Sequence, residues 1–171
     1  MKEMLKTFVA FSIAGILAFW VYTKDSTEFN PKEVPIITKD SPPCLQMYYL
    51  IEKYSEKYNV PREYAYGIAY SETRYKEPFQ WDYDHKQTSC VGAVGPMQIM
   101  YTTAQMMWPG KKFTKTFLKD NIEFNVETSM KLLQHLHNRY GDWKKVFGCY
   151  NTGRPMINQY ALNVYNYKPN F

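Results

Sequence analysis

The sequence has little of what marks several large functional classes. It contains only three cysteines, Cys44, Cys90 and Cys149, so at least one is unpaired, and they lack the spacing of a metal site. It has no glycine-rich nucleotide-binding loop and no nucleophilic Ser-His-Asp pattern. Its net charge of +5 is spread along the chain without a dense basic run. We therefore expect no metal and no nucleic-acid partner, whereas an anionic polymer or a membrane surface would suit the charge.

Long apolar runs are also absent, with one exception near the N-terminus. Residues 7–22, TFVAFSIAGILAFWVY, carry no charge and follow Lys2 and Lys6. A helix of this length spans about 24 Å, which is short for a bilayer and long for the core of a signal peptide. The run ends in aromatic residues typical of a membrane interface and has no small-residue cleavage pattern. We predict that residues 1–24 form an uncleaved membrane anchor, or otherwise a signal segment, with a cytoplasmic N-terminus.

A proline-rich linker is expected between this anchor and the folded part. Residues 25–43 are polar, contain four prolines and show no periodicity. The remaining residues, 44–171, are assigned to a single domain. With 45% hydrophobic and 18% aromatic residues, the chain can build one substantial core plus an extension, but not a second full domain.

Apolar periodicity predicts a mainly α-helical domain. No alternating strand pattern competes with it, although residues 79–94 are irregular enough to allow a small β-hairpin. The segment NVPREYAYGIAYSETRY is expected to begin a helix after Pro61. The other predicted helices cover residues 47–58, 121–140, 142–150 and 155–165.

One carboxylate continues the apolar face of the helix that follows Pro61. Ala65, Ile68 and Ala69 form this face, and the position seven residues after Ala65 is Glu72. Burial disfavours the charged form of a carboxyl group and raises its pKa, so Glu72 could hold a proton near neutral pH and donate it. The alternative is an ordinary surface glutamate that pairs with a neighbouring basic residue or reaches water.

A second unusual segment is SCVGAVGPMQIM, residues 89–100, which places a lone amide in an apolar run. Its two glycines suit a tight turn or a ligand close to the backbone, and its proline sets the direction of the chain that follows. Gln98, between Met97 and Ile99, either satisfies its amide inside the fold or directs it at a ligand.

Four motifs occur in a set order along the chain, and together they resemble a known family. Glu72-Thr73 corresponds to a catalytic Glu followed by Ser at a helix end. The others are a Ser-x-x-Gly-Ala-x-Gly-Leu-Met-Gln segment, matched by Ser89, Gly92, Ala93, Gly95, Met97 and Gln98; an Asn-Ile at the head of a long helix, matched by Asn121-Ile122; and Ala-Tyr-Asn-x-Gly, matched by Tyr150, Asn151 and Gly153. A late Tyr-x-x-x-Val is matched by Tyr160 and Val164. Over residues 45–165 the chain thus resembles the lytic transglycosylases of the soluble-transglycosylase, goose-lysozyme-like family.

The chain also departs from the family pattern. Glu72 and Ser89 are 17 positions apart, which is more than the family usually has. Pro96 stands where Leu is usual, Cys149 replaces Ala, and Asn125 replaces a common Gly. None of these changes removes a group that the chemistry needs.

The resemblance implies a fold and a reaction. The fold would be lysozyme-like, mainly α within an α+β class. The reaction would cleave the MurNAc-GlcNAc bond of peptidoglycan glycan strands without a cofactor, with Glu72 as acid and then base while the 6-hydroxyl of the sugar closes a 1,6-anhydro ring. Around Glu72, the resemblance implies substrate-binding roles for Ser89, Gly95, Met97, Gln98, Tyr150, Asn151 and Tyr160, the last placed to steady the acid or the reacting sugar.

Two alternatives and the cellular context stay open at this point. Asp82 and Asp84 could position a hydrolytic water, as acidic residues of goose-type lysozymes do, which would make the protein a muramidase. An inactive wall-binding or structural protein with the same fold is the other alternative. In each case we expect residues 7–22 to anchor the protein in a membrane, with the domain facing the periplasm or cell wall. The protein could also belong to a phage particle or a secretion assembly.

Overall fold

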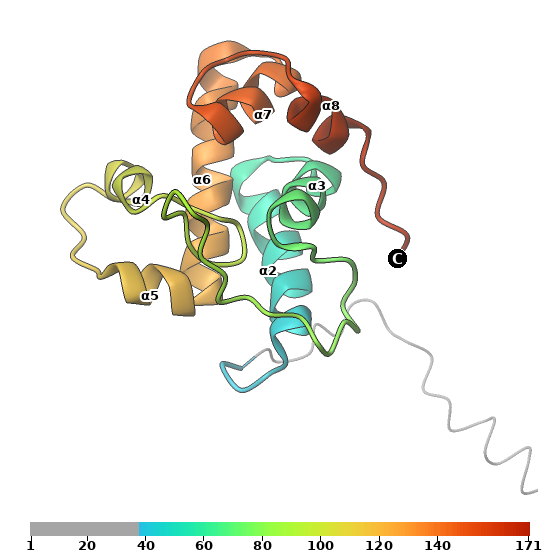
Figure 1. Cartoon of the computed structure of the whole chain (residues 1–171), viewed down its shortest axis with the longest axis vertical. Helices are drawn as coiled ribbons and strands as arrows, with labels where there is room; N and C mark the ends of the chain where they lie inside the picture. Colours follow the sequence, from blue (N-terminus) through green and yellow to red (C-terminus); the bar gives the residue numbers. More distant parts are fainter. Residues whose placement is uncertain (1–37) are drawn as a thin grey trace, which may run out of the picture. The chain divides into compact units, whose positions relative to one another are not determined.

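The structure, a computed structural model, describes residues 38–171 (Figure 1). The predicted anchor and most of the predicted linker lie outside the described residues. Within residues 38–171, no helix is long and apolar enough to cross a membrane.

Seven helices and no strand make up the described part of the chain, so the prediction of a mainly helical domain is confirmed. The small hairpin that residues 79–94 would allow is absent there. In its place, Val94 forms isolated bridges with Thr88 and Ile99. The helices are α2 (Pro43–Tyr58), α3 (Arg62–Thr73), α4 (Tyr101–Met107), α5 (Lys115–Asp120), α6 (Ile122–Tyr140), α7 (Trp143–Thr152) and α8 (Gln159–Asn166).

The core is built around α2 and α6, which pack along each other (Figure 1). Apolar residues at helical spacing give each helix one continuous buried face, as the sequence predicts. On α2 this face consists of Met47, Leu50, Ile51, Tyr54 and Tyr58, and on α6 of Ile122, Val126, Met130 and Leu133. Beside the buried faces, Lys53 pairs with Glu123 and Lys57 with Glu127, so the two helices are also joined by charged groups.

Helix α3 packs on α2 and on α8, and a glycine sets its distance from α8. A Cβ atom at Gly67 would lie 2.9 Å from the carbonyl oxygen of Val164 and 3.1 Å from the Cβ of Tyr167. Only a residue without a side chain allows this close approach. The middle of α3 is thereby held against the C-terminal end of α8.

The last helix begins later than the sequence predicts. Helix α8 starts after Asn158, whose side-chain oxygen accepts a hydrogen bond of 2.9 Å from the amide of Ala161. The residues before α8 pack directly on α7. The backbone of Met156 lies so close to Gly148 that a Cβ there would be 1.6 Å from the carbonyl oxygen of Met156. Met156 is therefore outside the helix and 47% exposed, not part of a buried stripe. The two short helices α4 and α5 were not predicted from the sequence.

Candidate active site

Glu72 lies in the last turn of α3, on the face that its sequence position predicts. Ala65, Ile68 and Ala69 are fully buried, and Glu72 continues this face at half-buried depth. Its Oε1 accepts a hydrogen bond of 2.5 Å from the hydroxyl of Tyr160. No basic residue within residues 38–171 forms an ion pair with it. Burial raises the pKa of Glu72, and the hydrogen bond from Tyr160 offsets this only in part.

Tyr160 comes from the first turn of α8 and is the direct partner of the carboxyl group. Burial, and secondarily the charge of Glu72, raises the pKa of Tyr160 well above its ordinary value. The phenol therefore stays protonated and acts as a donor. This matches the predicted position of Tyr160 beside the acid.

The glycine-rich segment is held in place from α6 by a single buried side chain, Asn125. Its Oδ1 accepts a hydrogen bond of 2.9 Å from the amide of Met97, and its Nδ2 donates to the carbonyl oxygens of Val94 and Leu118 at 2.9 and 3.0 Å. Gly95 has a φ of +79°, and a Cβ there would lie 2.4 Å from Nδ2 of Asn125. The contact with Asn125 therefore requires a glycine at this position, and the predicted role of Gly95 in substrate binding stays a prediction.

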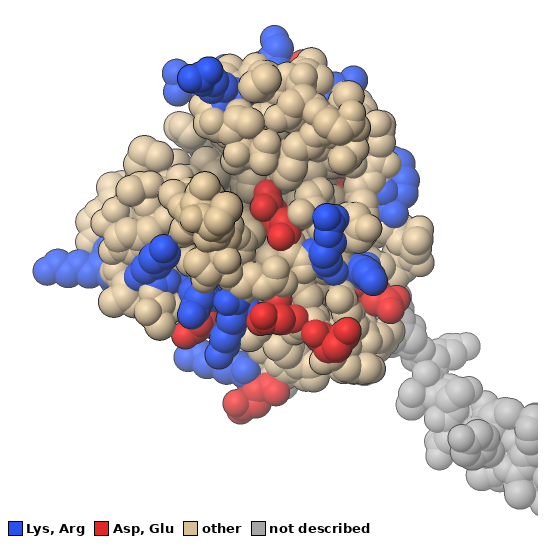
Figure 2. Space-filling view, in the orientation of Figure 1, with Lys and Arg blue, Asp and Glu red and all other residues tan. Residues whose placement is uncertain are grey.

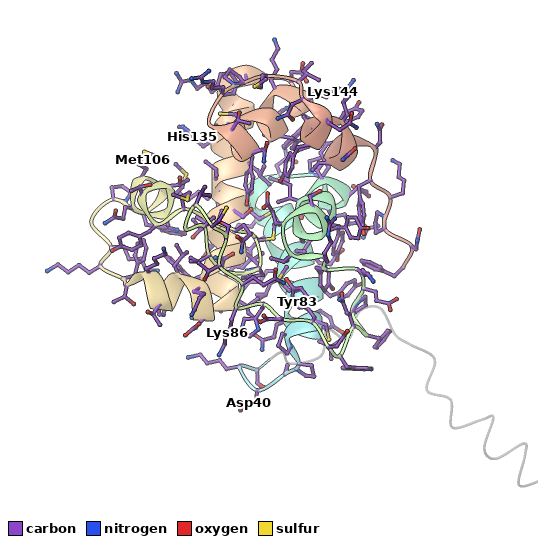
Figure 3. All side chains as sticks on the ribbon, viewed as in Figure 1. Asp40, Tyr83, Lys86, Met106, His135 and Lys144 are labelled. Atoms are coloured by element: carbon purple, nitrogen blue, oxygen red, sulfur yellow. The ribbon has the colours of Figure 1, made fainter. Side chains whose placement is uncertain are left out.

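Thr73, next to Glu72, ties the end of α3 to the same segment. Its buried hydroxyl lies 2.8 Å from the carbonyl oxygen of Pro96 and 2.8 Å from the hydroxyl of Tyr83. A hydroxyl has one proton, so Thr73 donates to Pro96 and accepts from Tyr83. Tyr83 lies within the body of the domain, whereas Lys86 lies at its edge (Figure 3).

Tyr150, on α7, holds the segment from a third side. Its hydroxyl donates to the carbonyl oxygen of Met97 at 2.6 Å and lies 3.0 Å from Oγ of Ser129, from which it accepts. The side chain of Met97 is fully buried. Tyr150 therefore supports the backbone of this segment, and the side chain of Met97 lies in the core; the substrate contacts predicted for both residues stay predictions.

Gln98 satisfies its amide N–H groups inside the fold, which is one of the two alternatives that its sequence position allows. Its backbone is left-handed, with φ +49°, and its Nε2 donates to the carbonyl oxygens of Gln87 and Gly95 at 3.2 and 2.9 Å. Within the described residues, no donor reaches its Oε1. The donor half of the amide is thus satisfied inside the fold, and its oxygen accepts no hydrogen bond from the described residues.

Ser89 and Asn151 are engaged with their own surroundings. Oγ of Ser89 accepts from the amide of Ala93 at 3.0 Å, which stabilises the turn. Oδ1 of Asn151, an exposed residue, accepts from Nδ2 of Asn158 at 3.2 Å. The structure shows no hydrogen bond from either residue to Glu72.

The two aspartates of the hydrolase alternative, Asp82 and Asp84, form no hydrogen bond with Glu72 or with its partner Tyr160. Asp82 and Asp84 are both exposed. Oδ1 of Asp84 accepts from the amide of Lys86 at 2.8 Å, a turn within its own loop. Neither aspartate shares a hydrogen-bond partner with Glu72.

The surface near these elements is hollowed. The face drawn in Figure 2 has a depression between the surface formed by α7 and α8 and the surface formed by α4 and the glycine-rich segment, and acidic side chains are visible in it. A pocket of about 350 Å³ adjoins Tyr160. Among residues 38–171, no group of three or more His, Cys, Asp or Glu side chains is placed to hold a metal ion.

Comparison with known families decides the relationship. Residues 49–170 match the Transglycosylase SLT domain family, which is more than half of the chain. The chain belongs to this family. A search of curated proteins gave no significant match.

Solved structures agree on the fold of this SLT domain. A 70 kDa soluble lytic transglycosylase in complex with bulgecin A is 25% identical with a TM-score of 0.53, over 69% of this chain and 18% of that one. The 70 kDa soluble lytic transglycosylase of Escherichia coli is 24% identical with a TM-score of 0.52, again over 69% and 18%. An inactive mutant of the lytic transglycosylase Slt from Pseudomonas aeruginosa is 18% identical with a TM-score of 0.51, over 62% and 16%. The chain thus spans less than a fifth of the length of these relatives.

Two supporting residues of this SLT domain were missed by the sequence analysis. Asn125 was noted only as a departure from a common glycine, although it carries three hydrogen bonds to the glycine-rich segment and α5. Ser129, one turn further along α6, orients Tyr150. Their only signal in the sequence was a polar residue at helical spacing beside the apolar stripe of α6.

Proposed function

We propose that this SLT domain is a peptidoglycan lytic transglycosylase that cleaves the MurNAc-β-1,4-GlcNAc bond and leaves a 1,6-anhydroMurNAc end. The observation that carries the proposal is Glu72, a carboxyl group with a raised pKa, a phenol as its partner and no cation paired with it. Burial shifts such a group toward the protonated form that a general acid needs. Membership of the family supports the reaction type.

The proposed reaction needs one carboxyl group in two roles. Glu72 gives its proton to the bridging oxygen while the bond from this oxygen to C1 of the muramoyl residue breaks. The resulting carboxylate then takes the proton of the 6-hydroxyl of the same sugar as the oxygen O6 bonds to C1. The proton balance closes, because Glu72 ends protonated, and no water is consumed.

The neighbours of Glu72 have roles that follow from their hydrogen bonds. Tyr160 donates to Oε1, which orients the carboxyl group and stabilises it after the proton has left. The free Oε1 of Gln98 is available to accept from a sugar hydroxyl or an N-acetyl N–H. Asn125, Thr73 and Tyr150 hold the glycine-rich segment that carries Gln98.

Replacing the acid tests this mechanism. Glu72→Gln keeps the acceptor for Tyr160 but cannot give a proton, so activity on peptidoglycan should fall by about 10² to 10⁴ while helicity is retained. The matched control is Asp82→Asn with Asp84→Asn, which should have little effect because no carboxylate has to activate water. Mass analysis of wild-type products should show 1,6-anhydro ends, lighter by one water than hydrolysis products.

Other outcomes select the alternatives. Reducing-end products, together with loss of activity in the double Asn variant, would make the protein a muramidase. Full activity in Glu72→Gln would contradict both enzymatic mechanisms. A folded wild-type protein that binds peptidoglycan without cleaving it would be the inactive wall-binding protein.

The cellular role is a further part of the proposal. Residues 7–22 would anchor the protein in a membrane, with the domain facing the periplasm or cell wall, or within a phage particle, for local opening of the wall by a phage or an envelope-spanning machine. The charge-free run after Lys2 and Lys6 supports the anchor. Deletion of residues 1–40 should leave a soluble, folded domain, measured by membrane fractionation and circular dichroism. Aggregation of the truncated chain would contradict this boundary.

A further inference from the structure

The loop of residues 74–88 joins α3 to the glycine-rich segment and is longer than the family usually has. Its outer part is exposed, with Phe79 and Trp81 at 64% and 65%. Its inner part returns to the domain, where Tyr83 is buried and Gln87 is half-buried. A long loop without regular structure has many conformations, so specific contacts must fix the place where it returns.

The side chain of Gln87 brings the loop back to the end of α3. Its Nε2 donates to the carbonyl oxygens of Thr73 and Asp84 at 3.2 and 2.9 Å. Both partners can only accept, so the amide nitrogen must face them. Thr73 is the last residue of α3, and a carbonyl group at a helix end has no partner within the helix. Gln87 therefore caps the helix that carries Glu72.

The backbone of the same residue holds the glycine-rich segment. The carbonyl oxygen of Gln87 accepts from the amide of Gly95 at 3.0 Å and from Nε2 of Gln98 at 3.2 Å. Gln98 has a left-handed backbone, which persists in a residue with a side chain only where neighbouring contacts enforce it. Gln87 thus contacts the helix end beside the acid with its side chain and the predicted substrate-binding amide with its backbone.

A second glutamine of this loop, Gln80, provides a matched comparison. It is half-buried like Gln87, and its Oε1 accepts from the amide of Lys76 at 2.9 Å, which closes a turn inside the loop. Within residues 38–171, its side chain forms no hydrogen bond to α3 or to the glycine-rich segment. The two glutamines therefore differ in what they connect, not in residue type or depth.

We propose that Gln87 is a positioning residue for the cleavage reaction, which fixes the placement of Glu72 relative to Gln98. The inference rests on the proposed function. Gln87 acts through Thr73 and Gln98, because its hydrogen bonds reach the acid only through the helix end. A shift between the acid and the amide would misplace the scissile bond relative to the proton, while the rest of the cleft still holds the glycan. The chemical step should therefore suffer more than binding.

Steady-state kinetics of the full-length chain on soluble, uncross-linked glycan strands of defined length test the proposal. Gln87→Met keeps the length of the side chain and removes both donors. It should lower kcat about tenfold, less than the ~10²-fold cost of a 1 Å misplacement, and leave KM within about twofold. Gln80→Met is the matched control and should leave kcat unchanged. Circular dichroism verifies that both variants are folded at the assay temperature.

A carboxyl group at the same position gives a reading that a packing role would not produce. An ionised carboxylate only accepts and would face two carbonyl oxygens, whereas a protonated carboxyl has one O–H to donate. For Gln87→Glu, the ratio of its kcat to that of wild type should therefore rise as pH falls through the pKa of the introduced group. For Gln87→Met, the same ratio should not change with pH.

Two further variants test how Gln87 acts. Gln87→Lys keeps a donor for the carbonyl oxygens and should hold kcat within about threefold of wild type, also where the Met variant fails to fold. In a double-mutant cycle, Gln87→Met should cost less in a Gln98→Met background than in wild type, about threefold or less, because the amide that it places is gone. Full additivity of the two losses would overturn the proposed role.

The remaining outcomes separate this inference from the proposed function. Equal kcat in Gln87→Met and wild type, or an equal fall in Gln80→Met, would overturn the role of Gln87 while the proposed function stands. A higher KM at unchanged kcat would also overturn it, since Gln87 would then serve glycan binding. A folded wild-type chain that does not cleave the strands would overturn both.

Discussion

Two regions of the molecule contain the same pair of side chains, a glutamate that accepts from a tyrosine hydroxyl, in different surroundings. Between α2 and α6, Glu123 accepts from Tyr54 at 2.8 Å and also from Lys53 at 2.8 Å. In the candidate active site, Glu72 accepts from Tyr160 at 2.5 Å and has no cation. The other glutamate–tyrosine pairs of the described chain, Glu127 with Tyr58 and Glu52 with Tyr66, also include a basic residue.

The missing cation changes the chemistry of the carboxyl group. Hydrogen bonds from Lys53 and Tyr54 lower the pKa of Glu123. Burial raises the pKa of Glu72, and the bond from Tyr160 alone does not reverse this. A hydrogen bond from a phenol therefore does not by itself determine the pKa of a carboxyl group. Solvent access and a paired cation decide whether the glutamate is an ionised partner in a structural contact or a potential acid.

Among changes that leave Glu72 in place, the largest effect should come from separating the two members of the active-site pair. Gly67→Ala places a Cβ 2.9 Å from the carbonyl oxygen of Val164, so α8 must move and Tyr160 with it. A displacement of about 1 Å can cost about 10²-fold in rate, and we expect a loss of this order in peptidoglycan cleavage. Alanine favours a helix over glycine by about 1 kcal/mol, so local helix propensity acts in the opposite direction. Unchanged activity would show that the spacing of α3 and α8 does not matter.

Removing the phenol alone should have a smaller effect that also shows in the pH dependence. Tyr160→Phe should reduce activity about tenfold. A tenfold loss corresponds to roughly 1.4 kcal/mol, which is close to the low end of the range for a hydrogen bond to a charged group. The bond from Tyr160 lowers the pKa of Glu72, so its loss raises that pKa. The pH above which the acid is lost, read from kcat/KM against pH, should therefore move upward. Tyr54→Phe is the control and should leave both rate and profile unchanged.

The two carboxyl groups should respond oppositely to pH in stability. The pKa of Glu72 is raised above 4.5, so the folded state binds extra protons and wild-type stability falls as pH rises through that pKa. Glu72→Gln lacks this loss and should be more stable than wild type at pH 8, with the difference vanishing in acid. The pKa of Glu123 is lowered from 4.5, so its contribution is present above 4.5 and lost as pH falls.

Glu123→Gln should accordingly be less stable than wild type at pH 7, by roughly 0.2 to 1 kcal/mol because the pair is exposed, and equal to it in strong acid. Urea unfolding at pH 3, 5, 7 and 8 measures both variants. The same sign of the stability difference at pH 8 for Glu72→Gln and Glu123→Gln would contradict the comparison.

The smallest effect is expected from removing Lys53, the cation that pairs with Glu123 between α2 and α6. Lys53 is 58% exposed at its side chain, so Lys53→Ala should cost at most about 0.5 kcal/mol, less at high salt, and leave activity unchanged. Denaturant midpoints at low and high salt check this. A cost that persists at high salt would mean that the stem of Lys53 stabilises the fold by packing rather than by charge.

Prediction from the sequence succeeded where the signal was local. The buried faces of α2 and α6 follow from apolar residues at helical spacing, which any core would bury. The start of α8 was placed too early, because the backbone of Met156 packs on Gly148 and cannot be helical there. The hydrogen bond between Tyr150 and the carbonyl of Met97 was not predicted, since it crosses 53 positions of the chain.

By itself, the sequence determined that a carboxyl group would lie on the apolar face of α3, because the seven-residue step from Ala65 to Glu72 is a property of one helix. The tertiary structure decided what that carboxyl group meets. Its partner Tyr160 is 88 positions away, and it arrives only because Gly67 lets α8 approach α3. Long-range packing also decided that no cation pairs with Glu72, and burial without a cation is what raises its pKa.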